Sequence, residues 1–239
     1  MNTYFQFKQF IIQQDKTAMK VCTDACLLGS WVANKIENKD IVPQNILDIG
    51  CGTGLLSLML AQKTNAIIDA IEIDENAFIQ ATENAAISKW ENQINVFNED
   101  IVRYTSGKKY DLIICNPPFF NNQLKSNNND RNVAMHATQL SFTALAKAVK
   151  NNLSENGKTA LLLPHNIVNE FMAIMENEQL YLNEQLNISH STVHPFFRSV
   201  LLFTFMKQTQ TQNTISIKDS SDKYSAEFKM LLKDYYLYL

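Results

Sequence analysis

From residue 45 onward, short apolar β-rich runs alternate with segments whose apolar residues follow a helical period. The apolar runs lie at 46–50, 66–74, 94–100, 111–120 and 159–164 and near 182–190 and 199–206, and the helical segments lie at about 55–63, 75–89, 139–152 and 165–178. Such alternation is typical of a parallel sheet wrapped by helices. It predicts an open α/β fold with about seven mostly parallel strands and helices on both faces.

The chain is long enough for one such domain and too short for two independent enzymes. It has 239 residues, of which 46% are hydrophobic and 19% are charged, so it can bury a full core. Residues 1–40 precede the first strand and contain KVCTDACLLGSWVANK, which is typical of an amphipathic helix. We therefore expect a single domain over 1–239, with 1–40 as a helical extension and 45–239 as the core with a C-terminal helix.

The sequence favours a cytoplasmic protein without a bound metal. Its start, MNTYFQFKQFII, lacks the regions of a secretory signal, and no run of about 18 apolar residues occurs. The four cysteines form no C-x-x-C pair and have no histidine at zinc-ligand spacing. The four histidines also fit no catalytic triad, which disfavours a hydrolase.

The strongest cofactor signal is the stretch LDIGCGTG between a strand and a helix. Gly50, Gly52 and Gly54 let the backbone turn sharply and approach a ligand closely. A dinucleotide site would need G-x-G-x-x-G, but Leu55 stands where the last glycine is required. Asp48, just before the turn, disfavours a pyrophosphate and favours a cationic or zwitterionic ligand such as S-adenosylmethionine.

Acidic residues end the next two strands. Glu72 follows Gly50 by about 20 residues, the spacing at which an acid binds a ribose diol. Asp100 ends the third strand and would face the same crevice, where its carboxylate and the N–H of Ile101 could bind an adenine. Asp74 is better explained as the N-cap of the following helix.

The reaction class is indicated by Asn116, Pro117, Pro118 and Phe119 at the end of the fourth strand. An exocyclic or amide nitrogen is a poor nucleophile because its lone pair is delocalised into the adjacent π-system. The side-chain oxygen of Asn116 and the next backbone carbonyl can each accept one N–H and aim the lone pair at a methyl group. The prolines fix that carbonyl, and Phe119 offers a face on which a planar base or amide can stack. No general base is needed before the attack.

LDIGCGTG and NPPF together resemble class I S-adenosylmethionine-dependent N-methyltransferases, which carry the signature N/D-P-P-F/Y/W. More narrowly, the chain resembles the bacterial tRNA1(Val) adenine-N6 methyltransferase family over nearly its whole length, through FKQFIIQQDKTAMKVCTDACLLGSW, NPPFF, HPFFRSVLLF and YSAEFKMLLKDYYLYL. The resemblance implies a Rossmann-like fold whose seventh and last strand is antiparallel, with the helix at 23–34 over the cofactor site. It also implies methyl transfer to N6 of adenine 37, just 3′ of the anticodon, with S-adenosylhomocysteine as product.

The candidate site residues then fall into three groups. Those for catalysis hold and stack the flipped-out adenine: Asn116, Pro117, Pro118 and Phe119. Those for the cofactor lie at or near the ends of the first three strands: Asp48, Gly50, Gly52, Gly54, Glu72, Asp100 and Ile101. Further candidates, either for the amino-acid end of the cofactor or for the RNA, are Lys20, Thr23 and Asp24. Those for substrate RNA are basic or can become so: Lys16, Lys125, Arg131, His136 and Arg198.

The formal charge of −3 argues against binding a polyanion through overall charge, so RNA contacts need local basic patches. The Asn-rich stretch 121–133, directly after NPPF, is expected to form a loop. Its sequence is consistent with either a functional lid or a simple linker. Met135 stands where the family often has a second arginine, which weakens an RNA contact there. We expect tRNA1(Val) as the partner, with salt-sensitive binding, no membrane and no obligate protein partner.

Three other functions stay open. Another enzyme with the NPPF signature could methylate a glutamine amide in a protein or guanine N2 in rRNA. The chain could also bind the cofactor without catalysis, although the intact NPPF is poor support for that function. A nicotinamide-dependent oxidoreductase is the third, with an incomplete G-x-G-x-x-G pattern against it.

Overall fold

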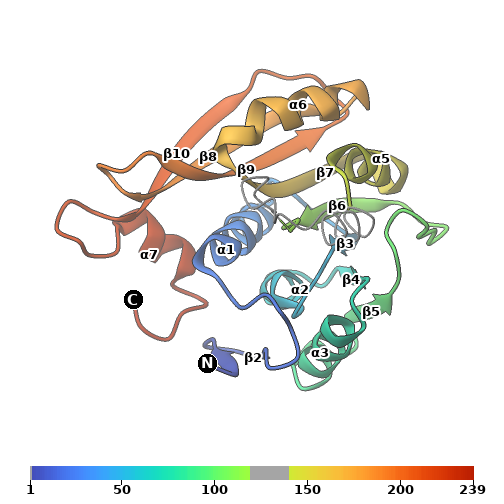
Figure 1. The fold of residues 1–239 in the computed structure, drawn as a ribbon, viewed down its shortest axis with the longest axis horizontal. Helices are drawn as coiled ribbons and strands as arrows, with labels where there is room; N and C mark the ends of the chain where they lie inside the picture. The colour runs from blue at the N-terminus through green and yellow to red at the C-terminus, as the bar shows by residue number, and fades with distance from the viewer. Residues whose placement is uncertain (1, 119–139) are drawn as a thin grey trace, which may run out of the picture.

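An eight-stranded sheet runs through the centre of the computed structural model, which describes residues 2–118 and 140–239 (Figure 1). Its strand order is β10-β8-β9-β7-β6-β3-β4-β5. In chain order the strands are β3 (Asn45–Ile49), β4 (Ile67–Glu72), β5 (Ile94–Asn98), β6 (Tyr110–Cys115), β7 (Leu153–Pro164), β8 (Tyr181–Ser191), β9 (Phe196–Thr204) and β10 (Thr211–Lys218).

Parallel pairing aligns the ends of five of these strands. The pairs β3–β4, β3–β6, β4–β5 and β6–β7 are parallel, and Ile49 lies level with Ile71 and Cys115. The seventh strand of the sheet, β9, runs antiparallel between β7 and β8. The carboxyl ends of the parallel strands therefore share one edge, the edge at which α/β proteins bind ligands. The predicted α/β fold and the antiparallel seventh strand are confirmed.

The predicted count of seven strands, with the antiparallel strand last, is wrong. β10 adds an eighth strand, which pairs parallel to β8 at the end of the sheet. Of its eight residues, only Ile215 is buried, and its first half is polar and exposed. An edge strand with one buried side chain lacks the apolar alternation by which a strand is recognised in a sequence.

Helices cover both faces of the sheet, as predicted (Figure 1). One face carries α1 (Thr23–Glu37), α2 (Leu55–Ala61), α3 (Glu75–Ala86) and α7 (Ala226–Leu232), and the other carries α5 (Phe142–Asn152) and α6 (Val168–Asn177), which follows a 3-10 turn (His165–Ile167). Asp74 accepts a hydrogen bond from the Ala77 N–H at 2.8 Å, which confirms it as the N-cap of α3. Alternate residues of the central strands pack against the two helical layers.

Most element boundaries lie within a few residues of the prediction, and β7 differs most. The sequence predicts this strand at 159–164, whereas it begins at Leu153. Its first part is polar, SENGK, and pairs with β6 through Leu153 and Tyr110 before the register shifts. A polar stretch of strand next to an irregular pairing carries no period-two pattern, so the sequence alone did not reveal it.

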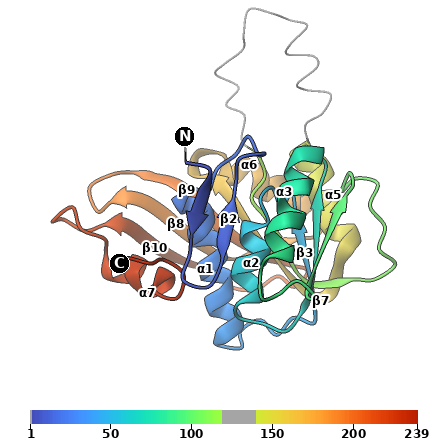
Figure 2. The same cartoon turned by 90° about the horizontal axis from the view of Figure 1, so that it is seen from below.

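The N-terminal extension holds a hairpin that the sequence did not predict. β1 (Tyr4–Gln6) pairs antiparallel with β2 (Ile11–Gln13), and each strand has three residues, too few to show a period. The Asn84 side chain of α3 binds the backbone of Gln13 at 2.9 and 2.8 Å and the carbonyl of Thr53 at 2.9 Å. The hairpin, which Figure 2 shows beside α2 and α3, is thereby tied to the turn that follows β3.

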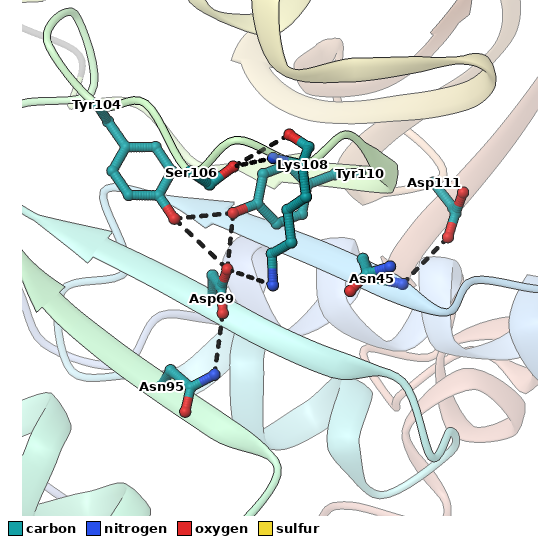
Figure 3. A network of polar contacts seen from close by, with 8 residues as sticks. All are labelled: Asn45, Asp69, Asn95, Tyr104, Ser106, Lys108, Tyr110 and Asp111. Atoms are coloured by element: carbon teal, nitrogen blue, oxygen red, sulfur yellow. Dashed lines mark hydrogen bonds and ion pairs between the residues drawn. The ribbon is translucent and has the colours of Figure 1, made fainter.

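The crossover from β5 to β6 contains no helix: residues 99–109 lead through turns directly to β6. Behind the crossover lies a buried polar cluster around Asp69 of β4, which is 3% exposed (Figure 3). Asp69 accepts hydrogen bonds from the Tyr110 hydroxyl at 2.7 Å and from the Asn95 amide at 3.0 Å, and it lies 2.8 Å from the Lys108 Nζ. These contacts hold the crossover against the sheet.

Candidate functional site

Four predicted site segments meet at the carboxyl edge of the sheet. The glycine turn follows β3, Glu72 ends β4, Asp100 follows β5 and Asn116 follows β6. Because these strands are neighbours and their last residues lie level, the four segments line one stretch of that edge. The structure therefore brings together residues that are spread over more than a quarter of the chain.

The glycine turn has the backbone shape that only glycine adopts readily. Gly50 and Gly52 have φ of 69° and 56°, in the left-handed region. A Cβ built on either of them would meet no atom within 4 Å, so both face open space. The N–H groups of Gly50 and Cys51 donate to the carbonyl of Ile71 at 2.9 and 3.1 Å, which anchors the turn to β4. Gly54 also has a positive φ, of 79°, and is the N-cap of α2.

Glu72 joins the glycine turn to the end of β4. One carboxylate oxygen accepts the Gly52 N–H at 2.8 Å, and the other accepts the Asp74 N–H at 2.9 Å. The residue is 8% exposed. A carboxylate has about four acceptor positions, so both oxygens can still accept a ligand hydroxyl. This geometry fits the predicted binding of a ribose diol.

Asp48 is fully buried beneath the same turn. Its Oδ2 accepts hydrogen bonds from the Ser57 hydroxyl at 2.7 Å and the Ser57 N–H at 3.1 Å, whereas its Oδ1 has no partner among the described residues. Burial raises the pKa of Asp48 to about 7, despite the two hydrogen bonds from Ser57. A buried acceptor without a donor is unfavourable, and a cationic ligand would relieve it. The buried oxygen and the open turn thus fit the amino-acid end of S-adenosylmethionine.

Asp100 shapes the turn that follows β5. Its Oδ1 accepts the Val102 N–H at 2.9 Å, and its Oδ2 lies 4.0 Å from the Nε of Arg103. The side chain is 35% exposed, so it can also accept from a ligand at this edge. Ile101 beside it is buried.

Asn116 lies half-buried directly after β6, and its side chain makes no hydrogen bond within the described residues. Pro117 is buried and Pro118 is exposed. The amide of Asn116 is therefore available to a substrate at the carboxyl edge. Four predicted site residues lie outside the described residues: Phe119, Lys125, Arg131 and His136.

Several lower-ranked candidates make contacts within the chain. Asp24 at the start of α1 and Arg198 of β9 form an ion pair at 2.9 Å, which joins a candidate for the cofactor to one for the RNA. Lys20 donates to the backbone carbonyls of Gln14 and, at 2.8 Å, of Thr17. Two further candidates also belong to the extension: Lys16 pairs with Glu83, and Thr23 begins α1.

His165 also lies at the carboxyl edge, although the sequence predicts it only as a residue that begins a helix. His165, in the 3-10 turn after β7, has its Nδ1 2.9 Å from the Ser199 Oγ, which donates to Asn187 at 2.7 Å. Ser199 and Asn187 are fully buried on neighbouring strands. Since Ser199 lies 34 residues after His165, the contact leaves no local pattern from which the sequence could predict it.

The described residues 2–118 and 140–239 lack two features that would bear on function. None of their helices is long and apolar enough to cross a membrane. None of their His, Cys, Asp and Glu side chains form a group of three that could hold a metal ion.

Residues 29–158 match the model of a protein family described as the methyltransferase small domain. The chain is 38% identical to the tRNA1(Val) (adenine(37)-N6)-methyltransferase of Christiangramia forsetii, with 100% of this chain and 99% of that protein covered. It is 40% identical to the protein of the same name from Bacteroides fragilis, with 98% of each chain covered.

Solved structures share the fold at low sequence identity. A predicted O-methyltransferase from Agrobacterium tumefaciens gives a TM-score of 0.66 at 15% identity, over 88% of this chain and 96% of that one. A putative class I S-adenosylmethionine-dependent methyltransferase from Listeria monocytogenes gives a TM-score of 0.61 at 10% identity. The match covers 92% of this chain and 71% of that one. The chain thus has the fold of class I methyltransferases, as predicted.

Proposed function

The chain belongs to the tRNA1(Val) (adenine(37)-N6)-methyltransferase family, and on this basis we propose that it transfers a methyl group from S-adenosylmethionine to N6 of adenine 37 in tRNA1(Val). The observation that carries the proposal is the meeting of Asp48, Glu72 and Asn116 at one edge of the sheet. The first two offer acceptors for a cationic amino-acid tail and a ribose, and the third offers an amide for an amine nucleophile.

The cofactor supplies a methyl group bonded to a sulfonium. In this proposal, Asp48 and the glycine turn bind the methionine end, and Glu72 binds the ribose. Asp100 and the N–H of Ile101 bind the adenine. Lys20, Thr23 and Asp24 stay further candidates near the amino-acid end or the RNA.

Asn116 and the Pro117 carbonyl position the reacting amine. Each oxygen accepts one N–H of the N6 amine, which draws the nitrogen toward tetrahedral geometry and aims its lone pair at the methyl carbon. Since the lone pair is aimed in this way, no side chain has to remove a proton before attack. Formation of the N–C bond would break the bond between the methyl carbon and sulfur, S-adenosylhomocysteine would leave, and the methylated nitrogen would release its extra proton to water. The target adenine would be flipped out of the anticodon loop and stacked on Phe119.

We further propose that residues 1–239 form one cytoplasmic domain in which the extension 1–40 covers the cofactor site. The tie from β2 through Asn84 to Thr53 supports this, because it holds the extension beside the glycine turn. The candidates for RNA contact are Lys16, Lys125, Arg131, His136 and Arg198.

The test is incubation of the protein with labelled S-adenosylmethionine and an unmodified tRNA1(Val) transcript, followed by nucleoside analysis. We expect N6-methyladenosine in this transcript and none in a transcript with guanine at the target position. Binding of S-adenosylhomocysteine without any N6-methyladenosine would exclude this substrate. Labelled glutamine in protein or N2-methylguanosine in rRNA would then identify another reaction of the NPPF class.

We expect cofactor binding to depend on the protonation of Asp48. Because its pKa is raised to about 7, Asp48 is mostly neutral below that pH, and a cationic amino group prefers the carboxylate. The affinity for S-adenosylhomocysteine should therefore rise by up to about tenfold per pH unit below pH 7 and level off above it. Calorimetric titration between about pH 5.5 and 8 measures this slope.

The matched variant is Asp48→Asn, which keeps the shape of the side chain and removes its titration. It should bind S-adenosylhomocysteine weakly and without this pH slope. It should also unfold at a higher temperature than the wild type at pH 8, because a raised pKa makes the buried acid destabilising as the pH rises from about 4 to 7. An unchanged slope in Asp48→Asn would assign the pH dependence to another group.

A further inference from the structure

A groove of about 550 Å³ lies between the β5–β6 crossover and α5. Its charged lining residues are three lysines, Lys108, Lys109 and Lys147, and the polar residues Thr105 and Ser106 also line it. None of the described residues that line it is acidic. Its volume lies within the range of ligand sites, and its charge favours an anion.

The groove exists because no helix connects β5 to β6. The crossover lies over the Asp69 cluster and leaves space along α5. One end is lined by Ile101 and by Ala144 in the first turn of α5, next to Asp100 at the carboxyl edge. The other end is lined by Lys109 and Asn152, where β6 and β7 begin. The groove therefore leads away from the candidate active site along one side of the molecule.

Both walls of the groove are held in place. The Lys108 Nζ lies 2.8 Å from the buried Asp69 and 5.4 Å from the ring centre of Tyr110. The Lys109 Nζ donates to the carbonyl of Asn151 in α5 at 2.6 Å, which ties the crossover to the helix. The groove is thus formed before a ligand arrives, which lowers the cost of binding.

The positive charge is left largely unbalanced. Asp69 neutralises Lys108, but Lys147 is exposed and has no ion pair within the described residues. Arg103, on the same crossover but outside the groove lining, has 89% of its side chain exposed, and its ion pair with Asp100 spans 4.0 Å. By contrast, Lys16 and Arg198, the described residues predicted to contact RNA, are both in ion pairs.

We propose that this groove binds the sugar-phosphate backbone of the substrate tRNA beside the flipped adenosine. The proposal rests on the proposed function, since it takes the RNA as the occupant. The lysine ammonium groups suit phosphate oxygens. The ring of Tyr104 is buried in the groove wall, so it offers no open face for stacking bases. Backbone contacts of this kind add affinity without reading sequence, which explains how a chain of charge −3 binds RNA.

The test compares the variant Lys109→Gln/Lys147→Gln with the matched control Lys223→Gln/Lys229→Gln. The control removes two exposed lysines near β10, at the other end of the sheet. Affinity for the tRNA1(Val) transcript is measured by fluorescence anisotropy at several salt concentrations. We expect the groove variant to bind about tenfold more weakly at low salt, with a salt slope reduced by about 2, because each lost phosphate contact lowers the slope by about 1.

Affinity for S-adenosylhomocysteine should stay unchanged in the groove variant. Since Lys109 also contacts α5, the single variant Lys147→Gln is measured as well, and it should lower the salt slope by about 1. If the groove variant matches the control in affinity and salt slope while the wild type methylates tRNA, the groove does not bind the tRNA backbone. The proposed function is unaffected by that result. A wild type that neither binds nor methylates tRNA overturns both.

Discussion

Replacing Asn116 with alanine is expected to lower kcat for methyl transfer by about 10²–10³-fold, with little change in the affinity for S-adenosylhomocysteine. In the proposed mechanism, the side-chain oxygen accepts an N–H of the amine while the lone pair becomes nucleophilic. Without it, the nitrogen stays conjugated with the adenine ring and its lone pair is not aimed at the methyl carbon. Single-turnover methylation of the tRNA1(Val) transcript measures the loss, and calorimetry measures binding.

The structure permits a sharp control for this prediction. Because the Asn116 side chain makes no hydrogen bond within the described residues, Asn116→Ala should unfold at nearly the wild-type temperature. Asn116→Asp keeps an acceptor oxygen and should retain more activity than the alanine variant. An alanine variant with unchanged kcat would remove Asn116 from the reaction. A joint fall in unfolding temperature and cofactor affinity would indicate a structural role instead.

The meeting of the candidate site residues at one edge could be predicted from the sequence because they stand at strand ends. Glu72 ends β4 and Asn116 follows β6, so a parallel sheet is enough to bring them to one edge. The partner of Asp48 was harder to predict, since Ser57 lies nine residues further on, inside α2. The only local sign was a serine interrupting the apolar run LLSLMLA. A buried serine in such a run needs a polar partner, and Asp48 supplies it.

Pairings between distant segments could not be predicted in the same way. Arg198 has the sequence context of an RNA contact, but it pairs with Asp24, which is 174 residues away. The basic groove was missed for a related reason: Lys109 and Lys147 lie on separate elements. Only the missing helix between β5 and β6 makes them neighbours, and the sequence showed no sign that the crossover would leave space beside α5.

Asp69 is the residue whose loss should destabilise the fold most. The sequence shows an acid in the middle of the apolar strand IIDAIE, and the structure explains it by four partners (Figure 3). Besides Tyr110, Asn95 and Lys108, the Tyr104 hydroxyl lies 3.4 Å from its carboxylate. Although burial opposes it, the Lys108 ammonium and the donors of Asn95 and Tyr110 lower the pKa of Asp69 below its usual value.

Asp69→Ala is therefore expected to lower the free energy of unfolding by about 3–5 kcal/mol at pH 7, because it leaves buried donors and an ammonium without their acceptor. Since the pKa of Asp69 is lowered in the folded state, its stabilising effect is present above the unfolded pKa of about 3.9 and is lost as the pH falls below it. Denaturant unfolding at pH 7 should thus show a lower free energy of unfolding for the variant than for the wild type. The difference between the two free energies should become smaller toward about pH 3. Tyr110→Phe, which removes one hydrogen bond and keeps the ring, should cost about 1 kcal/mol. If Asp69→Ala cost no more than Tyr110→Phe, the carboxylate would act as one acceptor among several and not as the centre that fixes the crossover to the sheet.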